Sequence, residues 1–205
     1  MLVLDHIVVA AETLEDGRQY VEDALGVRMQ AGGKHALMGT HNLLLGLEDG
    51  LYLEVISVDP EAPKPDCKRW FGLDEFSGSP RLTNWVGRSD ELVGDMALAF
   101  GRNILPTELS RGDLRWKMSV IDEGQTPFGG LVPMMLDWGQ GPKASDRLAA
   151  SGCHLRNLVL GHPDNPGLSK HLARFVGEPI IRVEHREETA MTAALQTPRG
   201  EVILC

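Results

Sequence analysis

Two side chains in the first sixty residues have the chemistry of a metal site or of an acid–base pair. His6 interrupts the apolar run Leu4-Asp5-His6-Ile7-Val8-Val9, and Glu54 interrupts the run Leu51-Tyr52-Leu53-Glu54-Val55-Ile56. Both runs predict β-strands, over residues 2–10 and 51–58. An ionised carboxylate buried without a partner costs several kcal/mol, so Glu54 must be protonated, paired with a cation or bound to a metal. His6 is the nearest candidate partner.

The two-residue period of a strand gives each side chain an expected face. It places His6 with Leu4 and Val8, and it places Asp5 on the opposite face. A neutral imidazole together with a carboxylate suits a divalent cation, which would be zinc, manganese, iron, nickel or magnesium. Without a metal, the carboxylate would fix the tautomer of the imidazole and raise its basicity, giving a general base for removing a proton beside a carbonyl group. Both schemes use His6 and Glu54.

Other polar side chains are candidates for substrate binding. Strand 82–88 places Asn84 and Arg88 on the face equivalent to that of His6. There Arg88 would offer a forked donor to a carboxylate or enolate oxygen, and an ordinary ion pair at the strand end is the alternative. His41 is the best additional ligand candidate, and Arg111 with Trp116 would border a pocket. The remaining histidines are expected at the solvated surface: His35, His154, His162, His171 and His185.

The chain contains three copies of one small unit, each an apolar strand followed by a helix that ends at a glycine. The position of His6 is occupied by Asn84 and Asn157 in the other copies. Three predicted strands follow each helix, so the units are βαβββ, over residues 1–58, 82–138 and 152–205, joined by linkers 59–81 and 139–151. We expect a single domain over residues 1–205 with an α+β fold, in which units pair into curved mixed sheets around a cleft. Which two units pair does not follow from the sequence.

Composition and charge exclude several classes of protein. The chain has 20 Lys and Arg against 29 Asp and Glu, a net charge of −9, which disfavours nucleic-acid binding. Cys67, Cys153 and Cys205 fit no zinc-ligand spacing, which favours reduced thiols in a cytoplasm. The first residues lack a basic leader and a long apolar span, so we expect no membrane insertion. No phosphate loop or dinucleotide fingerprint occurs, so no nucleotide cofactor is expected.

The two strand motifs and the repeated unit together resemble the vicinal oxygen chelate superfamily, which contains glyoxalase I, extradiol dioxygenases and bleomycin-resistance proteins. The motifs Gly39-Thr40-His41-Asn42, Tyr52-Leu53-Glu54, Asn84-Trp85 and Leu114-Arg115-Trp116 resemble its glyoxalase-like branch. The resemblance implies a divalent metal in the cleft between paired units. Side chains from the first and fourth strands of each unit would hold it, and it would chelate adjacent oxygens of the substrate. His6 and Glu54 match the ligands of the first unit.

The other two units depart from this ligand pattern. Their first-strand equivalents are Asn84 and Asn157, and their fourth-strand equivalents are Met134 and Leu204. Amide oxygens are poor ligands for soft cations, and Met134 and Leu204 carry no charge. These departures argue against glyoxalase I activity itself.

The resemblance implies an enzyme that acts on a small, oxygen-rich, carboxylate-bearing molecule. His6 and Glu54 would be its catalytic residues and metal ligands, and the candidates for substrate binding are Arg88, Asn84, Asn157 and His41. Metal-assisted isomerase or lyase chemistry is favoured over dioxygenase chemistry. The alternative is a metal-free protein that sequesters a small ligand, as bleomycin-resistance proteins do. Three units leave one unit without a partner, and whether it pairs within the chain or across a homodimer does not follow from the sequence.

Overall fold

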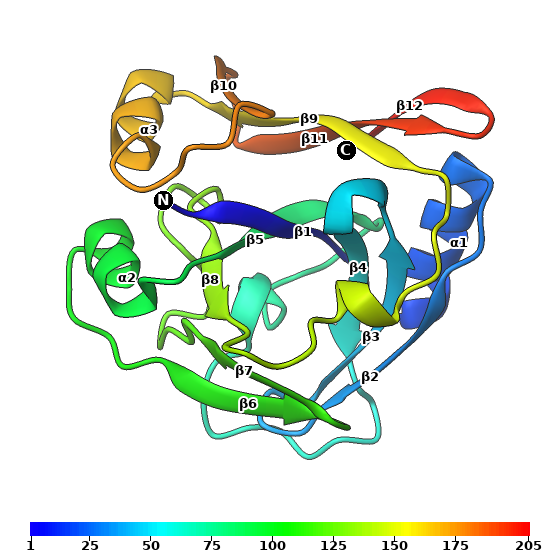
Figure 1. Cartoon of the computed structure of the whole chain (residues 1–205), viewed down its shortest axis with the longest axis horizontal. Coiled ribbons are helices and arrows are strands. Elements are labelled where there is room, and N and C mark those ends of the chain that lie inside the picture. Colours follow the sequence, from blue (N-terminus) through cyan, green and yellow to red (C-terminus); the bar gives the residue numbers. More distant parts are fainter.

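Two βαβββ units lie side by side in the computed structural model, which describes residues 1–205 (Figure 1). They share one curved sheet of eight strands in the order β2-β3-β4-β1-β5-β8-β7-β6. The first unit consists of β1 (Val3–Ala10), α1 (Leu14–Leu25), β2 (Gln30–His35), β3 (Thr40–Gly46) and β4 (Tyr52–Val58). The second consists of β5 (Arg81–Arg88), α2 (Leu92–Phe100), β6 (Thr107–Arg111), β7 (Leu114–Met118) and β8 (Met134–Asp137). The predicted α+β class and the curved mixed sheet are confirmed.

The register of the ladders shows which positions of the two units correspond. In the antiparallel β1–β5 ladder, His6 pairs with Val86 and Val8 pairs with Asn84. In the parallel ladders on either side, Val8 pairs with Glu54 of β4 and Val86 pairs with Met134 of β8. Asn84 is therefore the counterpart of His6, and Met134 is the counterpart of Glu54. Both correspondences agree with the alignment of the repeats.

The third unit has the same order of elements but pairs its strands differently. It consists of β9 (His154–His162), α3 (Asn165–Leu172), β10 (Ile181–His185), β11 (Ala190–Thr197) and β12 (Gly200–Leu204). These strands form a separate sheet of order β10-β9-β11-β12, in which β9 is parallel to β10 and antiparallel to β11. In the other units the first strand lies beside the fourth. Because β12 does not pair with β9, the predicted correspondence of Leu204 with Glu54 is wrong.

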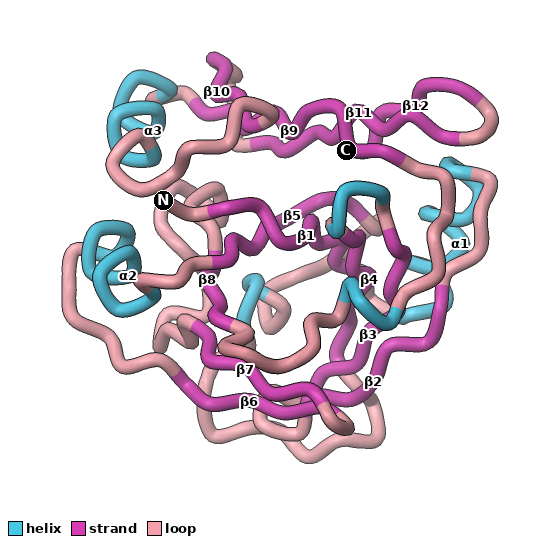
Figure 2. The backbone as a smooth tube through the Cα atoms, viewed as in Figure 1, coloured by secondary structure: helices cyan, strands magenta, loops and turns pink.

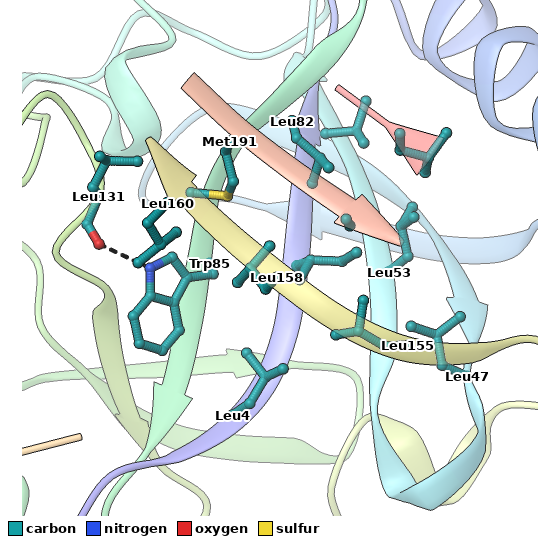
Figure 3. Close-up of a cluster of buried hydrophobic side chains, with 14 of the residues drawn as sticks. Leu4, Leu47, Leu53, Leu82, Trp85, Leu131, Leu155, Leu158, Leu160 and Met191 are labelled. Atoms are coloured by element: carbon teal, nitrogen blue, oxygen red, sulfur yellow. Dashed lines mark hydrogen bonds between the residues drawn. The ribbon is translucent and has the colours of Figure 1, made fainter. Parts of the chain in front are cut away.

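The main hydrophobic core lies between the two sheets. From the eight-stranded sheet it takes Ile7, Leu53 and Trp85, and from the four-stranded sheet it takes Leu158 and Leu195, all fully buried. Figure 3 shows these layers facing each other, with the Trp85 indole N–H donating to the backbone oxygen of Leu131 over 2.9 Å. The third unit therefore covers one face of the large sheet and leaves the other, concave face to form the cleft.

The concave face is filled in part by the linker between β4 and β5. Proline and glycine residues in this segment preclude a long regular element, and it forms only the one-turn helix η2 (Trp70–Gly72). Trp70 and Phe71 are buried in a second hydrophobic cluster with Val8, Val86 and other residues of the concave face. Figures 1 and 2 show this turn inside the curve of the sheet, between β4 and β8. The linker is therefore part of the cleft wall.

Helix ends follow the local chemistry of the sequence. Thr13 caps α1 by accepting a hydrogen bond from the Asp16 amide, and Gly26 ends this helix with φ of 71°, as predicted. The cap of α3 is Asp164, whose side chain accepts from the Gly167 amide, and this helix ends at Ala173 and not at the predicted glycine. The other one-turn helices are η1 (Glu48–Gly50) and η3 (Ser145–Arg147). None of the helices has the length and apolarity needed to cross a membrane.

Candidate functional site

A β-bulge in β1 brings Asp5 to the concave side of the sheet together with His6. The ladder with β5 shifts between these positions, since Leu4 pairs with Gly87 and His6 pairs with Val86. The irregularity breaks the alternation of faces, so Leu4 joins the core between the sheets while the Asp5 carboxylate reaches the His6 ring. The prediction that Asp5 and His6 face opposite sides is wrong for this reason.

Asp5, His6 and Glu54 form a buried chain that consists of one hydrogen bond and one ion-pair contact. His6 Nδ1 donates to Asp5 Oδ1 over 2.8 Å, and His6 Nε2 lies 3.4 Å from Glu54 Oε2. Burial by itself lowers the pKa of His6, but the hydrogen bonds and charges of the two carboxylates outweigh burial and raise it to about 8. Burial by itself raises the pKa of Glu54, but the His6 hydrogen bond and charge reverse this and lower it to about 2. At neutral pH an imidazolium therefore lies between two carboxylates.

Further contacts hold the ends of this chain in place. Asp5 Oδ2 accepts from the Trp138 indole N–H over 3.0 Å and from Arg88 Nη1 over 3.4 Å. The Tyr52 ring stacks on the His6 ring, with centroids 4.3 Å apart and planes 19° apart. The imidazole is thus fixed by a hydrogen bond at Nδ1 and by an aromatic face. Its Nε2 is directed at Glu54.

Asn42 connects Glu54 to a second cluster of polar groups. Its side-chain N–H₂ group donates to Glu54 Oε1, and its Oδ1 accepts from the Gly33 amide over 2.8 Å and from Arg111 Nη1 over 3.1 Å. Arg111 comes from β6 at the far edge of the sheet, so its side chain spans the gap between β6 and the opposite edge strand β2. Asn42 therefore links the carboxylate of one unit to the guanidinium of the other.

Two glycines in β2 make this arrangement sterically possible. A Cβ atom at Gly32 would lie 2.0 Å from Asn42 Oδ1, and a Cβ atom at Gly33 would lie 2.6 Å from Arg111 Cδ. Neither separation is compatible with a side chain. Gly32 and Gly33 are therefore required for Asn42 and Arg111 to reach each other.

His35 completes the polar side of the site in its neutral form. Its Nε2 lies 3.4 Å from Arg111 Nη1 and 3.5 Å from Asn42 Nδ2, both of which are donors, so this nitrogen accepts. Nδ1 then carries the proton and donates to Thr40 Oγ1 over 3.0 Å. Burial lowers the pKa of His35 to about 4, and the Arg111 charge acts in the same direction. The prediction of a solvated surface histidine is wrong, since His35 is 7% exposed.

The polar groups and an apolar wall enclose one cavity. Its polar lining is supplied by His6, His35, Asn42, Glu54 and Arg111. Its apolar lining comes mainly from the second unit and the linker: Trp70, Phe71, Trp116, Met118, Leu136 and Trp138, with Tyr52 from β4. The prediction that Arg111 and Trp116 border a pocket is confirmed.

Four predicted substrate-binding residues lie outside the cavity lining. His41 alternates with Asn42 along β3 and so faces away from the site, and Asn84 Nδ2 donates to the Gly130 backbone oxygen over 3.4 Å. Arg88 contacts Asp5 behind His6, which is the ion pair considered as its alternative role. Asn157 lies in β9 of the other sheet. The repeats align Asn84 and Asn157 with His6, but the Asn84 amide bonds to Gly130 and Asn157 lies in the separate third sheet.

Asn42 could have been found from the sequence. The turn centred on Asp49 pairs Leu44 with Glu54 and Asn42 with Ile56, and cross-strand partners share a face. Because Glu54 and Ile56 share a face, Asn42 had to lie on the Glu54 side. His35 gave no comparable signal, because its burial depends on Trp70 of the linker, whose ring packs edge-on against it at 5.1 Å.

The donor set does not fit a divalent ion held in the manner of the superfamily. His6 Nε2 and Glu54 Oε2 are adjacent, but no group of three or more His, Cys, Asp or Glu side chains is placed to hold an ion. The corresponding positions of the second unit hold Asn84, whose amide is turned to Gly130, and Met134. Arg111 also brings a positive charge to the Glu54 partner Asn42. Two ligands beside a cation would bind a metal weakly.

Comparison with known proteins agrees with the fold. A hypothetical protein from Staphylococcus aureus is 14% identical, with 99% of this chain and 97% of that chain covered and a TM-score of 0.63. A Streptomyces coelicolor methylmalonyl-CoA epimerase in complex with 2-nitronate-propionyl-CoA is 15% identical, with 67% and 98% covered and a TM-score of 0.45. The epimerase from Mycobacterium tuberculosis is 16% identical, with 70% and 91% covered and a TM-score of 0.44. No curated protein matches the chain. The family model described as glyoxalase-like domain matches residues 4–176, and the protein therefore belongs to this family.

Proposed function

We propose that the protein is an isomerase or a lyase. It would remove a proton from the carbon beside the carbonyl group of a small molecule that also bears a carboxylate. The observation that carries this proposal is the buried Asp5–His6–Glu54 chain at the wall of a cavity. It holds an acidic N–H and a carboxylate 3.4 Å apart, which is the pairing of acid and base that enolate chemistry requires.

Each member of the chain has a distinct role in this scheme. Glu54 takes the proton from the carbon beside the carbonyl group, and the electron pair of the broken C–H bond passes to the carbonyl oxygen. His6 Nε2–H donates to that oxygen as its negative charge develops. A substrate oxygen that takes this N–H releases Glu54 from its hydrogen bond and makes the carboxylate more basic. Delivery of a proton to the opposite face of that carbon completes an isomerisation, whereas departure of a group from the adjacent carbon with its bonding electron pair completes a lyase reaction.

Arg111 is the proposed anchor for the substrate carboxylate, in place of Arg88. Only its Nη1 atom is used within the protein, on Asn42 and His35, so its other donors remain for a ligand. Trp116 and Met118 of the neighbouring strand β7 line the same cavity, so the site combines a charged group with apolar surface. The favoured substrate is therefore a small acid that carries an apolar substituent.

Exchange of substrate hydrogen with solvent tests this proposal directly. The protein is incubated in D₂O with a panel of small 2-oxo and 3-oxo carboxylates that differ in the size and polarity of the substituent, and loss of the hydrogen beside the carbonyl group is followed by proton NMR. We expect exchange with the wild-type protein and loss of it in Glu54→Gln and His6→Gln. His154→Gln is the matched control, since His154 is an exposed histidine outside the cavity.

The same assay separates the proposal from metal-assisted chemistry. Protein treated with a chelator is compared with protein supplied with zinc, manganese, iron, nickel or magnesium. Exchange that survives chelation supports acid–base catalysis by the side chains alone. Exchange that requires one of these ions, and metal binding that is lost in both Glu54→Gln and His6→Gln, would refute the metal-free scheme.

Sequestration of a ligand is the second candidate function. It is favoured by the aromatic lining, since Trp70, Trp116 and Trp138 all contribute to the cavity wall. Binding of a panel member, detected through tryptophan fluorescence, without any hydrogen exchange would support sequestration over catalysis.

A further inference from the structure

The cavity at His6 and Glu54 is too small for the substrate proposed above. Its volume is about 30 Å³, which is enough for about two water molecules, since one water needs at least about 10–15 Å³ measured in this way. A carboxylic acid with an apolar substituent is larger than two water molecules. Some part of the wall must therefore move before such a molecule can reach the polar groups.

The turn at Trp70 to Gly72 is the part of the wall with the fewest ties to the rest of the protein. Residues 66–75 make a single hydrogen bond to the rest of the protein, which the Gly72 amide donates to the Gly124 backbone oxygen over 3.0 Å. The other bonds are internal, above all the paired contacts of Arg69 with Asp74 at 2.8 and 2.6 Å. The turn is therefore held on the sheet mainly by the burial of its side chains and not by hydrogen bonds.

The closed position also carries local costs. Phe71 has φ of 59°, a left-handed conformation that residues other than glycine seldom adopt. The Trp70 indole N–H and the Arg69 Nε–H are buried without hydrogen-bond partners. Burial of the Trp70 and Phe71 rings in the concave cluster offsets these costs. Strain and lost hydrogen bonds oppose the favourable burial of the rings. Moving this turn off the sheet therefore costs less free energy than moving an ordinary core segment.

Phe71 lines both the cavity and a larger space outside it. The same side chain contributes to the cavity wall and to a groove of about 680 Å³, which is also lined by Gly72, Gln125, Thr189 and Cys205. This groove lies between the linker, β5, β11 and the end of the chain. Displacement of Phe71 would join the two spaces.

We propose that the Trp70–Gly72 turn is a gate over the Asp5–His6–Glu54 chain, and that Phe71 controls which molecules pass from the outer groove to the cavity. The inference rests on the proposed function only for the identity of the ligand. Access itself can be measured with a small neutral molecule, so gate and catalysis are tested separately.

A disulfide that locks the turn provides the test. A Cβ atom at Gly72 would lie 3.9 Å from Gln125 Cβ, within the range of about 3.5–4.5 Å found in disulfides. Gly72→Cys and Gln125→Cys are introduced together with Cys67→Ser and Cys205→Ser, so that the two exposed native thiols cannot interfere. The Gly72→Cys change alone in this background is the control for strain at the left-handed position.

Access is measured as acrylamide quenching of tryptophan fluorescence, because three of the four tryptophans line the cavity. We expect the oxidised double-cysteine protein to lose quenching relative to its reduced form, and a reducing agent to restore it. Phe71→Ala, without any disulfide, should increase quenching and accelerate hydrogen exchange at the amides of the turn. Equal quenching in the oxidised and reduced forms, or no increase in Phe71→Ala, would overturn the gate. A positive result would stand even if no substrate hydrogen exchange is found.

Discussion

Replacing Asp5 with Asn removes one charge from the site and keeps the shape of the side chain, so it isolates the electrostatic effect of that carboxylate. The pKa of His6 is raised from 6.5 to about 8, a difference of 1.5 units. At about 1.36 kcal/mol per unit, this difference corresponds to about 2 kcal/mol of folding stability. Since the folded pKa is the higher one, that contribution is complete below pH 6.5 and is lost as the pH rises through 8. Asp5 supplies the larger part of it.

Urea unfolding at two pH values tests this account. Asp5→Asn should cost up to about 2 kcal/mol more at pH 6 than at pH 9.5, where His6 is neutral in both proteins. Titration of His6 by NMR should show its pKa reduced in the variant. Asp95→Asn is the matched control, because Asp95 is buried, accepts from Ser89 Oγ over 2.7 Å and has no imidazole partner. A cost of Asp5→Asn that is the same at both pH values would refute the reasoning.

Three further predictions concern the supports of the site and the core. Gly32→Ala should disorder the site by displacing Asn42, whose Oδ1 would lie 2.0 Å from the new Cβ, and loss of the downfield-shifted Asn42 amide signals would report it in an NMR spectrum. The stability of the wild-type protein should be highest near pH 6.5. The pKa of His35 is lowered to about 4, so stability falls as the pH drops below 6.5, and the pKa of His6 is raised to about 8, so stability falls as the pH rises above 6.5. A urea midpoint that stays constant from pH 4.5 to 8.5 would contradict this. Leu158→Ala, between the sheets, should cost about 2–5 kcal/mol in urea unfolding without a change in the His6 pKa, and a shifted pKa would mean that the third unit reaches the site.

The sequence determined those features that depend on local pattern. Apolar periodicity gave the strands and helices of the first two units, and the interrupted apolar strands identified His6 and Glu54, whose side chains meet at 3.4 Å. The repeat alignment also gave the correspondence of Asn84 and Met134 with them. These inferences need only the strand period and the cost of burying a charge.

Tertiary structure alone decided which other side chains join them. Asp5 turned inward because a bulge in β1 interrupts the strand period, and no residue type marks that bulge in the sequence. Arg111 reached Asn42 because the curvature of the sheet brings β6 beside β2, although the two residues are 69 positions apart. Asn157 was excluded because the third unit formed a sheet of its own on the opposite face. Such contacts depend on register, curvature and packing between distant segments, and these are properties of the whole chain.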